Sequence, residues 1–264
     1  MIDNEHECDN VLTVKSYLML NQKELTILRK NWEIHQAIFA AIKEFLQIWI
    51  KASDVDALAL HMCKDNWVIS AFTGVYDYKY TLQTSVNDIV VHGRPLETII
   101  FKEWDVVTID FWVKDLKYGI CTDAAFTKII WDKKYPEKQR FLEVWKKALK
   151  KWLKQARSGK RVWDIGYAIQ TYVESEGFYI IKDLTWHWIW KSLHEDPYIY
   201  NYWAPWTGPL LKSGMTLCIE PILWFSSWEI IDKWNWEIYV ADGSIWCQFE
   251  HTILVTDWDP EIIV

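Results

Sequence analysis

The order of the predicted secondary structure repeats once along the chain. Two amphipathic helices precede a run of short strands, and a second pair of helices then precedes a second run, with the halves meeting near Asp132. Apolar residues at three- and four-residue steps predict the first pair at about 21–47 and from residue 53. The same spacing predicts the second pair at 136–153 and 162–176. This order indicates an internal duplication.

Local signals mark the ends of several of these elements. Asn21 followed by Glu24 is typical of a capping box at a helix start, and Gly177 stands where a helix end favours glycine. Short runs rich in β-branched residues predict the strands. They cover 67–72, 83–86, 89–91, 106–113, 118–121 and 125–131 in the first half, and 178–181, 215–219, 229–231, 238–241 and 249–256 in the second.

Five residues in apolar, strand-like contexts are candidate metal ligands. Asp110 in VTIDF and Glu220 in LCIEP each end an apolar run on a carboxylate, which is costly to bury unless it is paired or binds a cation. Asp123, His187 and Glu250 complete the set. Four carboxylates and one imidazole suit Mn, Co, Fe(II), Zn or Mg, and so many acids favour more than one ion. A single acid in a strand is more often a surface or salt-bridged group, so the prediction depends on all five residues meeting.

Composition argues against several other classes of protein. The chain has 264 residues, a formal net charge of -7 and 51% hydrophobic residues, which fits a soluble globular protein and not a nucleic-acid-coating one. Five scattered cysteines without a C-x-x-C pair indicate neither a disulfide framework nor a thiolate zinc site. The acidic start and the lack of about 18 consecutive apolar residues argue against a secretory signal and a membrane span. We therefore expect a cytoplasmic protein that does not enter a membrane.

Several motifs in a fixed order resemble type I methionine aminopeptidase. They are VVHG at 90–93, VTID at 107–110, His187 seven residues before the first residue of HEDP at 194–197, IEP at 219–221 and QFEHTI at 248–253. The resemblance implies an α+β pita-bread fold, in which helices related by a pseudo-two-fold axis surround a curved antiparallel β-sheet. It also implies an N-terminal extension at 1–20 and one catalytic domain at 21–264, with pseudo-repeats at about 21–131 and 133–264.

The resemblance implies a role for each candidate ligand. Asp110 and Asp123 would bind metal, and Asp123 and Glu250 would bridge two divalent ions. His187 and Glu220 would complete the shell of one ion. The ions would be Co, Mn, Fe(II) or Zn. Such a pair can activate a water and polarise the scissile carbonyl, so no serine or cysteine nucleophile is needed.

The implied reaction is removal of the initiator methionine from nascent proteins whose second residue is small. Glu220 would accept the proton of the attacking water. His194 would donate to the peptide or the developing oxyanion, and His92 would donate near the leaving-group nitrogen. Both histidines would therefore contact the substrate.

Nascent polypeptide N-termini are the implied partners of a monomeric enzyme that binds no specific nucleic acid. The basic stretch 146–161 could face ribosomal RNA at the site of synthesis. Lysines and arginines on the outer face of a helix are more often simply solvated. A ribosome contact is thus the weaker of the two interpretations of this stretch.

The segment between Asp110 and Asp123 departs from the family pattern. The two residues are 13 positions apart, because KDLKYGICT makes a longer hairpin than the family has. A slip of one residue would turn Asp123 to the other face of the sheet, whereas an extension by two residues would keep it facing the site. Asp115 is too close to Asp110 to replace Asp123. We expect the two aspartates to share a face.

The methionine-binding pocket is predicted from position alone. Tyr76, Tyr78 and Leu193 fall in the neighbourhoods that correspond to the family's pocket. A narrow apolar pocket is what a methionine side chain needs. For any one of the three, core packing is the more common role.

Tryptophan is unusually frequent and glycine unusually rare. There are 20 tryptophans and nine glycines, whereas average usage of about 7% predicts roughly 18 glycines. TWHWIW at 185–190 stands where the family has T-G-H-G-I-G. Other tryptophans stand in loops or near helix ends, where glycine gives the backbone freedom: Trp49, Trp104, Trp163, Trp203, Trp206, Trp234 and Trp258. One hypothesis is that the gene uses UGA for glycine and that the sequence translates it as tryptophan. The alternative is an authentic tryptophan-rich paralogue.

Two other functions share this fold. A non-catalytic pita-bread binding protein could have its cleft blocked by Trp186, Trp188 and Trp190, although a binding module has no reason to keep five metal ligands. An aminopeptidase P or prolidase-like peptidase is the other alternative. Those enzymes usually carry an additional N-terminal domain, for which the first 20 residues leave no room.

Overall fold

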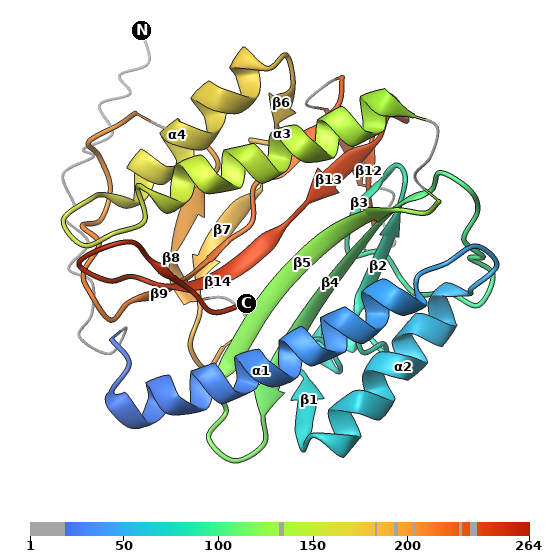
Figure 1. The fold of residues 1–264 in the computed structure, drawn as a ribbon, viewed down its shortest axis with the longest axis horizontal. Helices are drawn as coiled ribbons and strands as arrows, with labels where there is room; N and C mark the ends of the chain where they lie inside the picture. Colours follow the sequence, from blue (N-terminus) through green and yellow to red (C-terminus); the bar gives the residue numbers. More distant parts are fainter. Residues whose placement is uncertain are drawn as a thin grey trace, which may run out of the picture.

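The computed structural model describes residues 19–131, 135–182, 184–192, 195–202, 204–226, 229–232 and 237–264. Figure 1 shows the arrangement of its helices and strands. The helices are α1 (Gln22–Phe45), α2 (Ala52–Asp65), the short 3-10 helix η2 (Val75–Asp77), α3 (Pro136–Leu153) and α4 (Val162–Ser175). The strands are β1 (Val68–Ser70), β2 (Gln83–Val86), β3 (Ile89–Val91), β4 (Val106–Asp115), β5 (Cys121–Ile129), β6 (Tyr179–Ile180), β7 (Thr185–Trp188), β8 (Glu195–Tyr200), β9 (Thr216–Ile219), β10 (Ile222–Trp224), β11 (Ile230–Asp232), β12 (Ile238–Val240), β13 (Trp246–Gln248), β14 (Glu250–Leu254) and β15 (Glu261–Ile262).

A large antiparallel sheet connects the two halves of the chain. Its main path has the order β1-β4-β5-β14-β9-β7-β8, with β2 added beside β4 and β15 beside β14. Two three-stranded sheets, β13-β10-β6 and β11-β12-β3, complete the described β-structure. The helix pair α1 and α2 lies over the first-half strands, and the pair α3 and α4 over the second-half strands (Figure 1). This arrangement is the predicted α+β architecture with two helix pairs around an antiparallel sheet.

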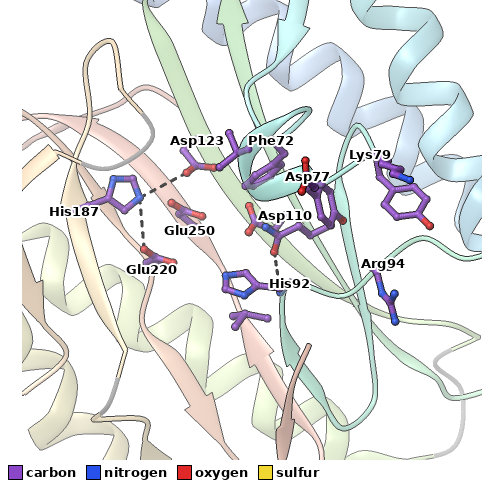
Figure 2. A pocket seen from close by; sticks show the side chains of 15 residues that line it. Phe72, Asp77, Lys79, His92, Arg94, Asp110, Asp123, His187, Glu220 and Glu250 are labelled. Carbon is purple, nitrogen blue, oxygen red and sulfur yellow. Dashed lines mark hydrogen bonds and ion pairs between the residues drawn. The ribbon is translucent and has the colours of Figure 1, made fainter. Parts of the chain in front are cut away.

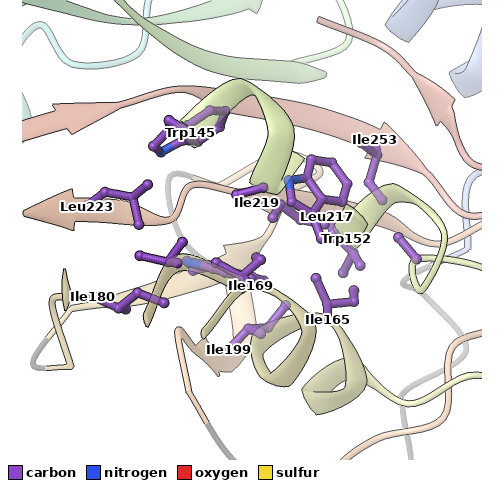
Figure 3. Close-up of a cluster of buried hydrophobic side chains, with 14 of the residues drawn as sticks. Trp145, Trp152, Ile165, Ile169, Ile180, Ile199, Leu217, Ile219, Leu223 and Ile253 are labelled. Atoms are coloured by element: carbon purple, nitrogen blue, oxygen red, sulfur yellow. The ribbon is translucent and has the colours of Figure 1, made fainter. Parts of the chain in front are cut away.

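Alternation along the strands sends one face of the sheet into the helix-covered core. Ile109 on β4 and Phe126 on β5 pack into one buried cluster with side chains of α1 and α2. Leu217 and Ile219 on β9 pack into another with Trp152 of α3 (Figure 3). Since successive side chains of a strand point to opposite faces, the residues between these point away from the helices. The candidate ligands are among them.

The helix predictions agree closely with the structure. α1 begins with the predicted capping box, in which Glu24 N donates to Asn21 Oδ1 and Asn21 N donates to the Glu24 carboxylate. Gly177 follows α4 with a φ of 82°. None of the helices in the described part of the chain is long and apolar enough to cross a membrane.

The strand predictions are less complete. The predicted strands 118–121 and 125–131 are wrong in their division, because β5 is one continuous strand and its first residue is Cys121. The carboxylate of Asp115 accepts the backbone N–H groups of Tyr118 and Ile120, each at 2.9 Å. The residues between Asp115 and the start of β5 therefore form a turn. The short strands β7, β8, β10 and β13 carry no clear alternating pattern, and the sequence did not predict them.

Two threonines join the halves of the sheet where β5 and β14 diverge. Glu250 and Ala125 are paired across these strands. On one side of this pair, Thr252 Oγ1 accepts from Asp123 N at 2.9 Å and donates to Asp123 O at 2.7 Å. On the other side, Thr127 Oγ1 accepts from Gln248 N at 3.0 Å and donates to Gln248 O at 2.8 Å. Side-chain oxygens thus replace strand-to-strand bonds on both sides of the pair.

Tryptophan occupies several backbone positions that favour glycine. Of the eight described non-glycine residues with positive φ, five are tryptophans. Side chains with a Cβ rarely adopt this conformation. Three of the five (Trp49, Trp104 and Trp206) stand where the sequence alone indicates glycine, and the other two are Trp67 and Trp131. Trp163 and Trp258 are not among them, and Trp203 and Trp234 lie outside the described residues.

Candidate metal centre

A cavity of about 450 Å³ opens on the face of the large sheet that the helices leave uncovered. The volume lies within the range of small-molecule binding sites, about 300 to 1,000 Å³. Figure 2 shows the side chains that line it. They include all five candidate ligands and His92: Phe72, Val75, Asp77, Tyr78, Lys79, Tyr80, Gln83, Val91, His92, Arg94, Asp110, Asp123, His187, Glu220 and Glu250.

The register of the β4–β5 hairpin places both aspartates on the cavity face. Asp123 is paired with Trp112, and Asp110 lies two residues from Trp112 on the same strand. Residues two apart on a strand share a face, so Asp110 and Asp123 are diagonal neighbours. The longer hairpin therefore keeps Asp123 facing the cavity. This agrees with the prediction that an extension by two residues preserves the face.

The second half of the chain supplies the other three ligands. His187 on β7 is paired with Cys218 on β9, and Glu220 follows directly after β9. Glu250 is the first residue of β14, which lies between β5 and β9 in the sheet. Strands from both halves therefore bring their acids to the same place.

The imidazole of His187 points into the group of carboxylates. Its Nε2 lies 3.7 Å from Asp123 Oδ2 and 3.6 Å from Glu220 Oε1 (Figure 2). Its Nδ1 lies 3.1 Å from the carbonyl oxygen of Trp188, which can only accept, so Nδ1 is the protonated nitrogen in that bond. When the ring is neutral, Nε2 carries a lone pair that can bind a cation. Glu220 is held from behind by Gln248 Nε2, which donates to Glu220 Oε2 at 3.0 Å.

Ionising the acids of the cavity costs free energy unless a cation compensates their charge. Burial raises the pKa of Asp110 to about 7. Burial also raises the pKa of Asp123, Glu220 and Glu250 well above the usual range, and repulsion from neighbouring carboxylates adds to it. Three buried carboxylate oxygens of the described residues accept no hydrogen bond, namely Asp110 Oδ1, Asp123 Oδ1 and Glu250 Oε1. Oxygen and imidazole donors in this number fit divalent cations, which would compensate the charge.

A thiol that the sequence interpretation left without a role lies among the ligands. One ligand atom each from Asp123, His187, Cys218 and Glu250 can be chosen so that all lie within 4.8 Å of one another. Cys218 Sγ is also 3.5 Å from Thr252 Oγ1. The sequence feature that could have indicated Cys218 is its position two residues before Glu220, because residues two apart on a strand share a face.

The remaining site predictions have mixed outcomes. His92 lines the cavity, directly after β3, with a φ of 61°. Tyr78 also lines it. His194, Leu193 and the side chain of Tyr76 lie outside the described residues. Position alone gave no signal for Gln83 or Arg94, which the structure adds to the cavity wall.

The tryptophans beside His187 do not enter the cavity. Trp186 and Trp188 are fully buried in the core cluster under α3 and α4, because strand alternation turns them away from His187. Trp190 packs against a cluster that contains Leu25 of α1. The expectation that these three side chains crowd the cleft is therefore wrong. The burial has a cost, since Trp188 Nε1 has no hydrogen-bond partner.

Comparison with known proteins identifies the family. Residues 26–257 match the profile of metallopeptidase family M24. The chain belongs to this family. It is 33% identical to methionine aminopeptidase 1 of Bacillus subtilis over 91% of this chain and 96% of the relative. It is also 33% identical to methionine aminopeptidase of Mycoplasma capricolum over 92% of this chain and 96% of the relative.

Solved structures support the pita-bread fold. The crystal structure of methionine aminopeptidase from Thermotoga maritima superposes with a TM-score of 0.88 at 35% identity, over 93% of this chain and 98% of that one. Prolidase from Pyrococcus furiosus superposes with a TM-score of 0.74 at 17% identity, over 93% of this chain and 65% of that one. The second likeness shows the shared fold alone. The predicted fold is confirmed, and the chain is a metallopeptidase by family.

Proposed function

We propose that this M24 protein is a methionine aminopeptidase that removes the initiator methionine from nascent chains whose second residue is small. The observation that carries the proposal is the convergence of four acids and one imidazole at the cavity, with Asp123, Glu250 and His187 buried. The near full-length similarity to methionine aminopeptidases supports it. We also propose that residues 21–264 form the single catalytic domain, with 1–20 as an extension.

The proposed cofactor is a pair of divalent ions. Asp110, Asp123, His187, Glu220 and Glu250 would hold them, with Asp123 and Glu250 as the shared ligands. Co, Mn, Fe(II) or Zn would suit this donor set. When bound, divalent ions supply Lewis acidity, which polarises a peptide carbonyl and lowers the pKa of a water.

The protein's own residues would move the protons. Glu220 would accept the proton of the attacking water, and the hydrogen bond from Gln248 keeps its carboxylate oriented toward His187. His92 would donate near the leaving-group nitrogen from its place on the cavity wall. His194 is proposed to donate to the peptide or the developing oxyanion.

An apolar part of the cavity wall would receive the methionine side chain. Phe72 and Tyr78 are in contact edge to face, with ring centroids 6.2 Å apart, and both line the cavity. The hydroxyl of Tyr78 lies 2.9 Å from the carbonyl oxygen of Leu82 and 3.1 Å from that of Gly93, and its one proton is shared between these acceptors. The ring therefore presents its apolar body to the cavity. Tyr76 and Leu193 keep their proposed places in this pocket.

The proposed setting is that of a monomeric enzyme in the cytoplasm, acting on nascent N-termini. The exposed lysines and arginines of 146–161 would favour approach to ribosomal RNA. Specific nucleic-acid binding is not part of the proposal, since the chain as a whole is acidic.

Peptide specificity distinguishes the proposal from its alternatives. Purified protein with Mn, Co or Fe(II) is given Met-Ala-Ser, Met-Gly-Ser, Met-Leu-Ser and Ala-Pro peptides, and the released amino acids are measured. We expect methionine from the first two and little from the third. Cleavage of Ala-Pro alone would favour a prolidase-like or aminopeptidase P-like enzyme. Binding of Met-Ala-Ser without cleavage would favour the non-catalytic alternative.

A further inference from the structure

The backbone of His92 has an uncommon conformation that a side chain on another strand holds. His92 has a φ of 61°, which residues with a Cβ seldom adopt. Its backbone N–H donates to Oε1 of Gln83 at 2.9 Å. Gln83 is itself buried, with 7% of its surface exposed, and it lies on β2 opposite Asp110. The amide of Gln83 therefore connects the ligand strand β4 to the residue that carries the imidazole.

The two residues after His92 are held as well, so little freedom remains for the segment. Gly93 O accepts from Thr84 N at 2.8 Å, and a Cβ at Gly93 would clash with the backbone oxygen of Thr84. Arg94 N donates to Glu237 Oε1 at 3.2 Å. With Gly93 and Arg94 fixed, the conformation at His92 decides where its imidazole points. A backbone hydrogen bond at that residue bears directly on it.

We propose that Gln83 is a positioning residue, which holds the imidazole of His92 toward the cavity by accepting its backbone N–H. The inference rests on the proposed function for the role of His92, but the geometric part stands without it. If the acceptor is removed, the partly buried N–H of His92 loses its partner, and the residue can relax from its left-handed conformation. The imidazole would then leave its place beside the carboxylates.

The test uses two substitutions of similar length and a double-mutant cycle. Gln83→Met removes the acceptor, whereas Gln83→Glu keeps an oxygen at the same reach. The kcat for Met-Ala-Ser is measured for Gln83→Met in the wild-type and His92→Ala backgrounds. We expect about a 10- to 100-fold loss in the first background and almost none in the second, since a residue that acts through His92 has no further effect without it. Gln36→Met, on the exposed surface of α1, is the matched control and should leave kcat unchanged.

A second measurement reads the position of His92 without using activity. In histidine-labelled, metal-free protein, the NMR signals of the His92 ring, assigned by their loss in His92→Ala, should shift or broaden in Gln83→Met. They should stay near the wild-type position in Gln83→Glu, which is assessed only by NMR because a carboxylate beside Asp110 would also alter metal binding. Metal content of Gln83→Met, measured by elemental analysis, should equal that of wild type.

The outcomes separate this inference from the proposed function. Unchanged His92 signals in Gln83→Met, or an equal loss of kcat in the His92→Ala background, would overturn the positioning role. If the wild-type protein releases no methionine, the proposed function fails, and the ring signals alone still decide whether Gln83 holds His92.

Discussion

At the scale of single residues, the buried carboxylates carry a cost when they are ionised, and a bound cation removes it. Asp110, Asp123 and Glu250 each have an oxygen without a hydrogen-bond donor. Such groups weaken the protein unless their charge is compensated. They are therefore expected to lower the stability of the metal-free protein while enabling metal binding.

Replacing Glu250 with glutamine should reverse both effects. The neutral amide removes one charge from the group, so metal-free Glu250→Gln should unfold at a higher temperature than metal-free wild type at pH 8. It should gain little on addition of Mn and should lose at least about 100-fold in activity, since a shared ligand is gone. Thermal unfolding with and without Mn measures this. A lower melting temperature together with normal Mn stabilisation would contradict the assignment of Glu250.

The hypothesis that UGA codons for glycine are translated as tryptophan is also tested at the residue scale. If UGA encodes glycine, each misread position lowers the mass of the native protein by about 129 Da relative to the sequence, because covalent composition fixes mass. The native tryptic peptide 183–191 would then lack three tryptophans. Mass spectrometry of protein from its own organism decides the question, and a native 183–191 peptide that contains all three would end the hypothesis.

In protein made with tryptophan, backbone strain gives an independent check that Trp49 occupies a position that favours glycine. Trp49→Gly should raise the melting temperature, since Trp49 has a φ of 72° and its side chain is 80% exposed. Trp258→Gly is the control. That side chain is 83% exposed but its φ is not positive, so the change should not stabilise the protein.

At the scale of secondary-structure elements, the threonine bridges between β5 and β14 hold the ligand strands together. Thr252→Val should lower the free energy of unfolding by about 1 to 3 kcal/mol, because it leaves the buried N–H and C=O of Asp123 without partners. Thr171→Val, on the exposed side of α4, is the control and should change little. Urea unfolding measures both, and equal effects would contradict the role of the bridge.

Elements with strong local signals could be predicted from the sequence, and those defined by pairing could not. The capping box of α1 and the apolar spacing of α3 are encoded locally, and both helices match their predictions. The sequence predicts two strands in place of β5, because Asp123 interrupts the apolar pattern. In the structure this site residue lies inside the strand. The site residues divide in the same way, into those with a local sequence signal and those placed by strand pairing. The ligands lie in recognisable motifs, whereas strand pairing and alternation bring Gln83 to the cavity wall and Cys218 among the ligand atoms.

At the scale of the whole molecule, the stability of the metal-free protein should depend on pH. The folded pKa of Asp110 is raised from 3.8 to about 7, so its contribution is present at low pH and is lost as pH rises through about 7. Burial lowers the folded pKa of His35 to about 3 and of His251 to about 4, so their contributions are lost as pH falls below 6.5. The folded pKa values of Asp123, Glu220 and Glu250 are raised as well, so the four acids together outweigh the two histidines. Metal-free protein should therefore melt lower at pH 8 than at pH 6.5.

Added Mn should raise the melting temperature more at pH 8 than at pH 6.5, because the ligands are then ionised at a smaller cost. Differential scanning calorimetry at the two pH values tests this. A metal-free protein that is more stable at pH 8, or an effect of Mn that is larger at pH 6.5, would contradict the charge balance inferred for the cavity.

The dependence of methionine release on metal tests the central claim most directly. Protein is treated with a chelator, dialysed, and titrated with Mn, Co or Fe(II), while methionine release from Met-Ala-Ser and bound metal are measured on the same samples. The account predicts that release is lost on chelation and returns as divalent metal binds, in wild type but not in Glu220→Ala. Full release of methionine by protein shown to contain no metal would contradict it.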